Sequence, residues 1–209
     1  MTYQVINRDS CPTTCRKMEG EFNMPGNIRP NPVGQKPEIS PKAYVDPMAV
    51  IIGPVFIGAG CYIGPHAVIR ADEVDEHSGL VASIIIKDGV NLQDGVILHA
   101  LAGTEILVEQ HCSLAHGSVV HGPCQIGTGS FIGFNSVVFK TNIGNGVMVK
   151  HAAVVEGIDI PAGKLVPTGA VICTVNQIDS LPDVTDENRE FMAEVVHTNI
   201  ELAAGYHRL

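Results

Sequence analysis

Aliphatic residues recur at every sixth position through most of the chain from Ile51 onward. The positions are Ile51, Ile57, Ile63, Ile69, Ile86, Leu92, Leu98, Val108, Leu114, Val120, Ile126, Ile132 and Val138, followed after a one-residue slip by Ile143, Val149, Val155, Ile160, Val166 and Ile172. A period of six fits neither the 3.6 residues of a helical turn nor the simple alternation of a strand. It is typical of a parallel β-helix, in which three hexads form one triangular coil. The pattern predicts a mainly β fold, with this β-helix over residues 41–175.

Two stretches interrupt the period, residues 73–85 and residues 100–107. Such insertions leave a rigid coil as loops at its corners, and functional residues gather on loops of this kind. We therefore expect any active site to lie beside them.

The two ends of the chain do not follow the period. Residues 1–40 are rich in proline, which excludes a helix or a central strand, so we predict an extended arm. The arm contains Cys11 and Cys15, which are either two free thiols or half of a metal site. Residues 183–205 have a helical apolar stripe with Thr185 or Asp183 as N-cap, and we predict a helix that covers one flank of the coil.

Composition narrows the classes of function. The net charge of −9 argues against nucleic acid as a partner, because an acidic protein repels phosphate. No apolar run reaches the ~18 residues of a membrane span, so no membrane partner is expected. The first residues lack the basic and apolar regions of a secretory signal, which favours a cytoplasmic location.

Three histidines lie inside the repeat, where buried aliphatic residues are expected. His99 follows Leu98 and His121 follows Val120, so both occupy the second position of their hexads and should stand side by side on adjacent coils. His116 lies on the preceding face and should point away from the pair. One chain would then give two ligands to one metal and a third to another metal.

Three neutral imidazoles are a known zinc ligand set that leaves a fourth position for water. Three chains around a threefold axis would close such sites between neighbours, which predicts a homotrimer. The alternative is a chance alignment of surface histidines, since the chain has nine.

Charged residues near the histidines suggest supporting roles. Arg70 and Asp72 interrupt one hexad, and Gln93 with Asp94 lies shortly before His99. If Ile69 and Leu92 head neighbouring hexads, Asp94 would hold Arg70 in place, and Gln93 would hydrogen-bond the water on the metal. The alternative is a surface ion pair of little energetic value.

The motifs IRADE, NLQDGVILHAL, SLAHGSVVHGP, FIGFNSVVFK and NIELAAGY, taken in this order, resemble the γ-class carbonic anhydrases. The resemblance runs from about Pro37 to Tyr206. It implies a left-handed β-helix with a C-terminal helix, assembled as a homotrimer with a metal shared across each interface. The metal would be Zn²⁺, with Fe²⁺ or Co²⁺ as alternatives. The residues matched to family roles are His99, His116 and His121 as metal ligands, Gln93, Glu73 and Asn199 as catalytic residues, and Arg70 with Asp94 as an interface ion pair.

The activity implied is the reversible hydration of CO₂ to bicarbonate and a proton by a metal-bound hydroxide. The chain departs from the family in two respects: Ala102 stands where the founding type of the family has a proton-relaying glutamate, and the stretch between Glu73 and Gln93 is longer than usual. Two other functions remain open. A hexapeptide-repeat acyltransferase would bind coenzyme A between coils and use one histidine as base, and a non-catalytic assembly module would use the trimer structurally.

Overall fold

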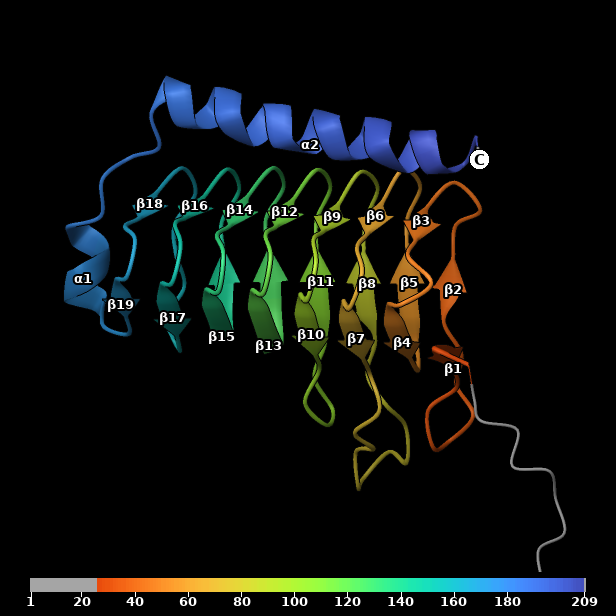
Figure 1. Cartoon of the computed structure of the whole chain (residues 1–209). Helices are drawn as coiled ribbons and strands as arrows, with labels where there is room; N and C mark the ends of the chain where they lie inside the picture. Colours follow the sequence, from red (N-terminus) through yellow and green to blue (C-terminus); the bar gives the residue numbers. More distant parts are fainter. Residues whose placement is uncertain (1–25, 209) are drawn as a thin grey trace, which may run out of the picture.

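The computed structural model describes residues 26–208 and shows a triangular prism of parallel strands with one long helix along it (Figure 1). The fold is a left-handed parallel β-helix, which confirms the predicted fold class. The residues that head the hexads point inward, and those of the central coils, such as Ile63, Leu98 and Ile132, are fully buried. Because these side chains are mostly β-branched or small, they stack in columns along the prism without strain.

Three faces make up the prism, and all strand pairs within them are parallel. Face 1 contains β1 (Ile28–Arg29), β4 (Val50–Ile52), β7 (Val68–Arg70), β10 (Ile97–His99), the first halves of β13 (Val119–Ile126) and β15 (Val137–Ile143), β17 (Val154–Glu156) and β19 (Val171–Ile172). Face 2 contains β2 (Glu38–Ile39), β5 (Val55–Ile57), β8 (Ile84–Ile86), β11 (Ile106–Val108) and the second halves of β13 and β15. Face 3 contains β3 (Tyr44–Val45), β6 (Tyr62–Ile63), β9 (Asn91–Leu92), β12 (Ser113–Leu114), β14 (Phe131–Ile132), β16 (Met148–Val149) and β18 (Leu165–Val166).

The coil starts earlier than the sequence pattern predicts. Strands β1 and β2 pair with β4 and β5, so residues 28–39 belong to the β-helix and not to an extended arm. The prolines of this stretch lie outside the two strands, where the missing N–H removes no ladder hydrogen bond. Cys11 and Cys15, with the rest of the predicted arm before residue 26, lie outside the described residues.

Face 3 is covered by α2 (Asp186–Tyr206), which runs back along the coil from β18 towards β3 (Figure 1). Thr185 is the N-cap, and its hydroxyl accepts a hydrogen bond from the backbone N–H of Asn188 at 3.2 Å. Beneath the helix lies a small apolar cluster that contains Phe131 and Met192. The short helix α1 (Val175–Asp179) follows the last strand. No helix within residues 26–208 has the length and apolar character that a membrane crossing requires.

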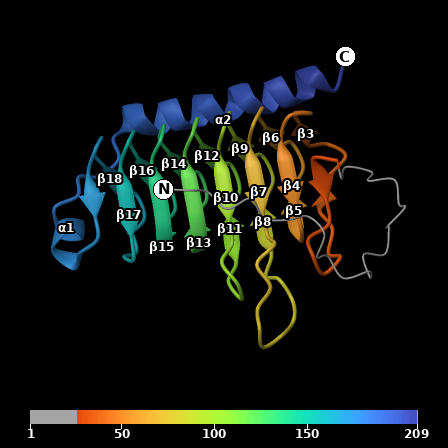
Figure 2. The same cartoon turned by 60° about the horizontal axis from the view of Figure 1, so that its bottom comes forward.

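Three loops leave the prism at the corner between faces 1 and 2: one joins β1 to β2, and the other two are those that the interruptions of the period predict. Of these two, one joins β7 to β8 and the other joins β10 to β11, and they lie on adjacent coils in both views (Figures 1 and 2). In β13 and β15 the chain instead passes from face 1 to face 2 in one continuous strand. The loop between β7 and β8 therefore begins directly after Arg70, and the loop between β10 and β11 begins directly after His99.

Candidate metal centre

His99 and His121 form a pair on the outside of face 1. They are register partners at the same position of β10 and β13, one strand apart. Nδ1 of His99 lies 3.1 Å from Nε2 of His121, and the two rings meet nearly at right angles. Nδ1 of His121 is buried and has no hydrogen-bond partner among the described residues. Two converging imidazole nitrogens supply two donors of the kind that Zn²⁺ binds in proteins.

Charged side chains surround the outer edge of His99. Its Nε2 lies 3.2 Å from an Arg70 guanidinium nitrogen, 3.4 Å from Glu73 Oε1 and 3.5 Å from Asp72 Oδ1. Burial lowers the pKa of His99, and the Arg70 charge lowers it further. This favours the neutral imidazole, which is the form that binds a metal.

Glu73 is held by the second loop. The backbone N–H of Ala102 donates to Glu73 Oε2 at 3.1 Å, while Oε1 faces His99. The Glu73 side chain is 40% exposed, so it joins the histidine pair to solvent. The short loop that lacks a family glutamate thus contributes a backbone donor that orients the carboxylate of the other loop.

His116 lies at a different edge of the prism, in the turn between β12 and face 1. Its Nδ1 is 3.5 Å from Asp94 Oδ2, and its side chain is 53% exposed. The neighbouring Gln93 donates from Nε2 to Asn91 Oδ1 at 3.4 Å, and Asn91 in turn donates to Ser113 Oγ at 2.7 Å. This chain of hydrogen bonds fixes the Gln93 amide beside the His116 edge.

Asn199 comes to this second edge from α2. It is buried, and its Nδ2 donates to the backbone carbonyl of Val195 at 2.9 Å, which leaves Oδ1 available. Gln93 and Asn199 line the same cavity of about 350 Å³, together with Phe191 and Thr198. The structure therefore brings these two amides together at one cavity.

The predicted site residues thus fall into two groups on one chain. The first contains Arg70, Asp72, Glu73, His99 and His121, and the second contains Gln93, Asp94, His116 and Asn199. Within residues 26–208 no single cluster brings together three His, Cys, Asp or Glu side chains that could hold a metal. The two groups lie at opposite ends of the face 1 strands, because His99 ends β10 whereas His116 precedes β13.

One expected contact does not form within the chain. Ile69 pairs with Leu98 and Leu92 pairs with Ile63, so Ile69 and Leu92 do not head neighbouring hexads. The expected contact of Asp94 with Arg70 inside one chain is therefore wrong. Arg70 instead meets Asp72 at 3.3 Å.

Face 1 also carries a partly exposed aliphatic ladder beside the histidine pair. Its members are register partners on successive strands: Val50, Val68, Ile97, Val119, Val137, Val154 and Val171. Ile97 is 40% exposed and Val171 is 55% exposed. A flat apolar strip of this length is typical of a protein interface.

The sequence analysis missed two residues that the structure places at the site. Phe139 packs edge-on against His121 with ring centroids 5.4 Å apart, and Asn91 supports Gln93. Both carried a signal, since Phe139 is second in its hexad, as His121 is, and Asn91 is a polar residue directly before a buried hexad leader.

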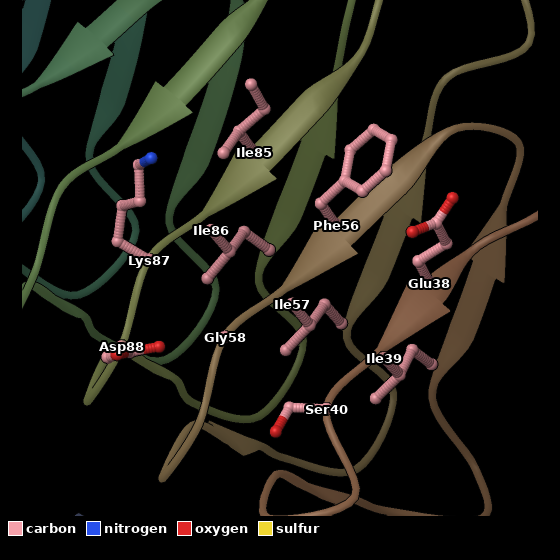
Figure 3. Close-up of a pocket in the computed structure, with 10 residues that line it drawn as sticks. All are labelled: Glu38, Ile39, Ser40, Phe56, Ile57, Gly58, Ile85, Ile86, Lys87 and Asp88. Carbon is pink, nitrogen blue, oxygen red and sulfur yellow. The ribbon is translucent and has the colours of Figure 1, made fainter.

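A second hollow lies on face 2, between β2, β5 and β8 (Figure 3). Phe56 and Ile85 line it together with Lys87 and Asp88. It contains no histidine or cysteine, so it lacks the donors of the histidine pair, and we assign the candidate site to the two histidine edges.

Comparison with known proteins gives the following relationships. No protein-family model matches the chain. The chain is 38% identical over 207 residues to a carbonic anhydrase of Methanosarcina thermophila, in an alignment that covers 86% of this chain and 81% of that protein. It is also 38% identical over 180 residues to the carboxysome assembly protein CcmM of Nostoc, covering 81% of this chain and 31% of that protein. The chain therefore spans about a third of that second relative.

Among solved structures, the chain resembles a hexapeptide transferase family protein from Anaplasma phagocytophilum. The TM-score is 0.71 at 23% identity, over 86% of this chain and 97% of that one. At this identity the likeness shows a shared fold alone.

Proposed function

Because the chain belongs to the γ-class carbonic anhydrase family, we propose that it catalyses the reversible hydration of CO₂ to bicarbonate and a proton. The observation that carries the proposal is the pair of converging nitrogens on His99 and His121, 3.1 Å apart on face 1. This pair supplies two donors of a three-imidazole set, and His116 on another edge is the third.

His99 and His121 of one chain, with His116 of a neighbouring chain, would hold Zn²⁺, with Fe²⁺ or Co²⁺ as alternatives. The donor chemistry fits, since His99 favours its neutral form and its Nδ1 converges with Nε2 of His121. Such an ion, when bound, supplies a Lewis acid that lowers the pKa of water in its open position.

The other residues act on the substrate and the proton. Gln93 is fixed by Asn91 and can orient the attacking water, while the free Oδ1 of Asn199 faces the same cavity and helps to place CO₂. Glu73 takes up the proton that is released when water adds to CO₂. Its partial exposure lets it pass that proton to solvent.

The proposal requires a homotrimer, because one chain does not join the two halves of the site. The partly exposed aliphatic ladder of face 1 supplies a surface for that assembly. We expect Val137→Asp to dissociate the trimer, because it places a charge within the apolar strip. Gln125→Asp, on face 2, is the matched control and should leave the mass in sedimentation equilibrium unchanged. A trimeric Val137→Asp protein would contradict this assignment of the interface.

The function is tested on protein purified without oxygen, by measuring metal per chain and then CO₂ hydration by stopped flow. Wild type should bind about one ion per chain and hydrate CO₂, while His99→Ala should lose both. His66→Ala, an exposed histidine of another turn, is the matched control.

A second candidate function is a non-catalytic assembly module, which the identity to a carboxysome assembly protein favours. Bound metal without CO₂ hydration would overturn the enzyme and support the module. The absence of bound metal in correctly folded trimers would overturn the shared histidine site itself.

A further inference from the structure

Two columns of outward side chains run along the prism with the same coil repeat. The face column follows the strand register of face 1 and contains Arg70, His99, His121, Phe139 and Glu156. The edge column lies in the turns between faces 3 and 1 and contains Asp94, His116, Phe134 and His151. Backbone hydrogen bonds join its successive turns, for example from Asn135 N to His116 O and from Ala152 N to Phe134 O.

A shared histidine site fixes how these columns meet at the seam between two chains. Rotation about an axis parallel to the coil keeps the columns of neighbouring chains parallel, and both advance by one strand spacing of ~4.8 Å per coil. If His116 of one chain lies between His99 and His121 of the next, every further coil repeats that relation. Two coils on, His151 comes to lie between Phe139 and Glu156.

We propose that His151 of each chain donates a hydrogen bond from Nε2 to the carboxylate of Glu156 of the partner subunit, two coils beyond each shared histidine site. This inference rests on the proposed function, because the shared site sets the register of the seam. It adds a polar contact at a second level of each seam, beyond the metal ligands.

The local geometry of His151 prepares it for this role. The backbone N–H of Phe134 donates to His151 Nδ1 at 3.1 Å, which makes Nδ1 the acceptor and puts the proton of the neutral ring on Nε2. The ring also stacks on Phe134 with centroids 4.3 Å apart and planes 10° apart, so it is held on the edge. Neutral or charged, His151 thus has an N–H donor at Nε2, which donates to no residue within 26–208.

Glu156 is prepared in the same way on the face column. It is exposed at the end of β17, beside Phe139, and no hydrogen bond or ion pair joins its carboxylate to any residue in the 26–208 range. Between this level and the histidine site, Phe134 of one chain would meet Phe139 of the partner subunit. An apolar aromatic contact there would exclude water and strengthen the polar contact beyond it.

Disulfide cross-linking tests the pairing without reference to activity. Cys11, Cys15 and Cys173 are first replaced by serine, and then His151→Cys and Glu156→Cys are combined in one chain. The extended strand between the two positions separates their Cα atoms by roughly 10 Å, beyond the ~7 Å limit for a disulfide within a chain. Mild oxidation should therefore give covalent trimers on a non-reducing gel.

Asn145→Cys with Glu156→Cys is the matched control, because Asn145 is an exposed turn residue at another edge of the prism. It should remain monomeric on the same gel. A trimer in solution that hydrates CO₂ but gives no covalent species with cysteines at 151 and 156 would overturn the pairing alone. A protein that is monomeric in solution would overturn the pairing together with the proposed function.

A charge exchange gives a second measurement that does not depend on cysteine chemistry. His151→Glu alone places like charges at every seam and should weaken the trimer by about tenfold. Adding Glu156→Lys restores opposite charges and should return the trimer to near its original dissociation constant. Equal weakening by the single and double variants would overturn the pairing.

Discussion

Mixing two inactive variants should restore about one quarter of wild-type activity. The variants are His99→Ala, which removes a donor from the half of the site on face 1, and His116→Ala, which removes the donor in the turn between faces 3 and 1. We call these the face half and the edge half of the site. The structure places these halves on different edges of one chain, so each seam of the trimer combines the face of one subunit with the edge of the next. A seam is intact when its face comes from the His116→Ala chain and its edge from the His99→Ala chain.

The magnitude follows from counting seams. With equal amounts of the two chains and random assembly, half of all faces and half of all edges are intact, so about one quarter of the seams combine two intact halves. Every mixed trimer, of either composition, contains one such seam. The expected recovery is therefore about 25% of the wild-type hydration rate and of the wild-type metal content.

The assay uses the two chains unfolded together in urea and refolded at equal concentration, with tags that let mixed trimers be isolated. Each variant refolded alone is the control and should be inactive. Isolated mixed trimers should carry about one ion per three chains. A mixture as inactive as its parts would refute the division of the site between chains, provided that mixed trimers have formed.

Three further predictions follow from the side-chain environments. Glu73→Gln should lower kcat by about tenfold or more with little change in kcat/KM, and imidazole buffer should restore the rate in stopped-flow assays. Glu76→Gln, in the same loop, is the control. An unchanged kcat in Glu73→Gln would contradict the proton role. Phe131→Ala should cost about 3–5 kcal/mol in urea unfolding at fixed chain concentration, because it empties a fully buried site beneath α2; a loss below about 1 kcal/mol would contradict its packing role. The pKa of His99 is lowered in the folded protein, so below the ordinary histidine pKa of 6.5 the unfolded state binds more protons, and the metal-free protein should lose stability as pH falls through that value. His99→Ala should flatten this part of the plot of unfolding free energy against pH. An unchanged slope of that plot would contradict the lowered pKa.

Much of the architecture follows from the sequence, because a coil repeats one local rule. Every sixth aliphatic residue is buried, the interruptions after Arg70 and His99 form loops, and Thr185 caps the covering helix. The predicted start of the β-helix at residue 41 was too late, because the prolines of residues 1–40 suggested an extended arm. The structure places those prolines outside β1 and β2, where they break no ladder.

The pairing of His99 with His121 could also be predicted from the sequence, because the two histidines share one hexad position. The relation between Arg70 and Asp94 was not, because it depends on how many coils each interruption of the period displaces. Ile69 meets Leu98 across the loop insertion, whereas simple counting along the hexads suggested Leu92.

The sequence by itself determined the repeat, the inward and outward positions, and the pairing of His99 with His121, because these depend on contacts between residues six positions apart or one coil apart. Only the tertiary structure decided that Ala102 orients Glu73, and that Gln93 and Asn199 share one cavity. These relations join segments brought together by loops and by a helix that folds back along the coil. Their distances depend on the three-dimensional path of the chain, which a local hydrophobic pattern does not encode.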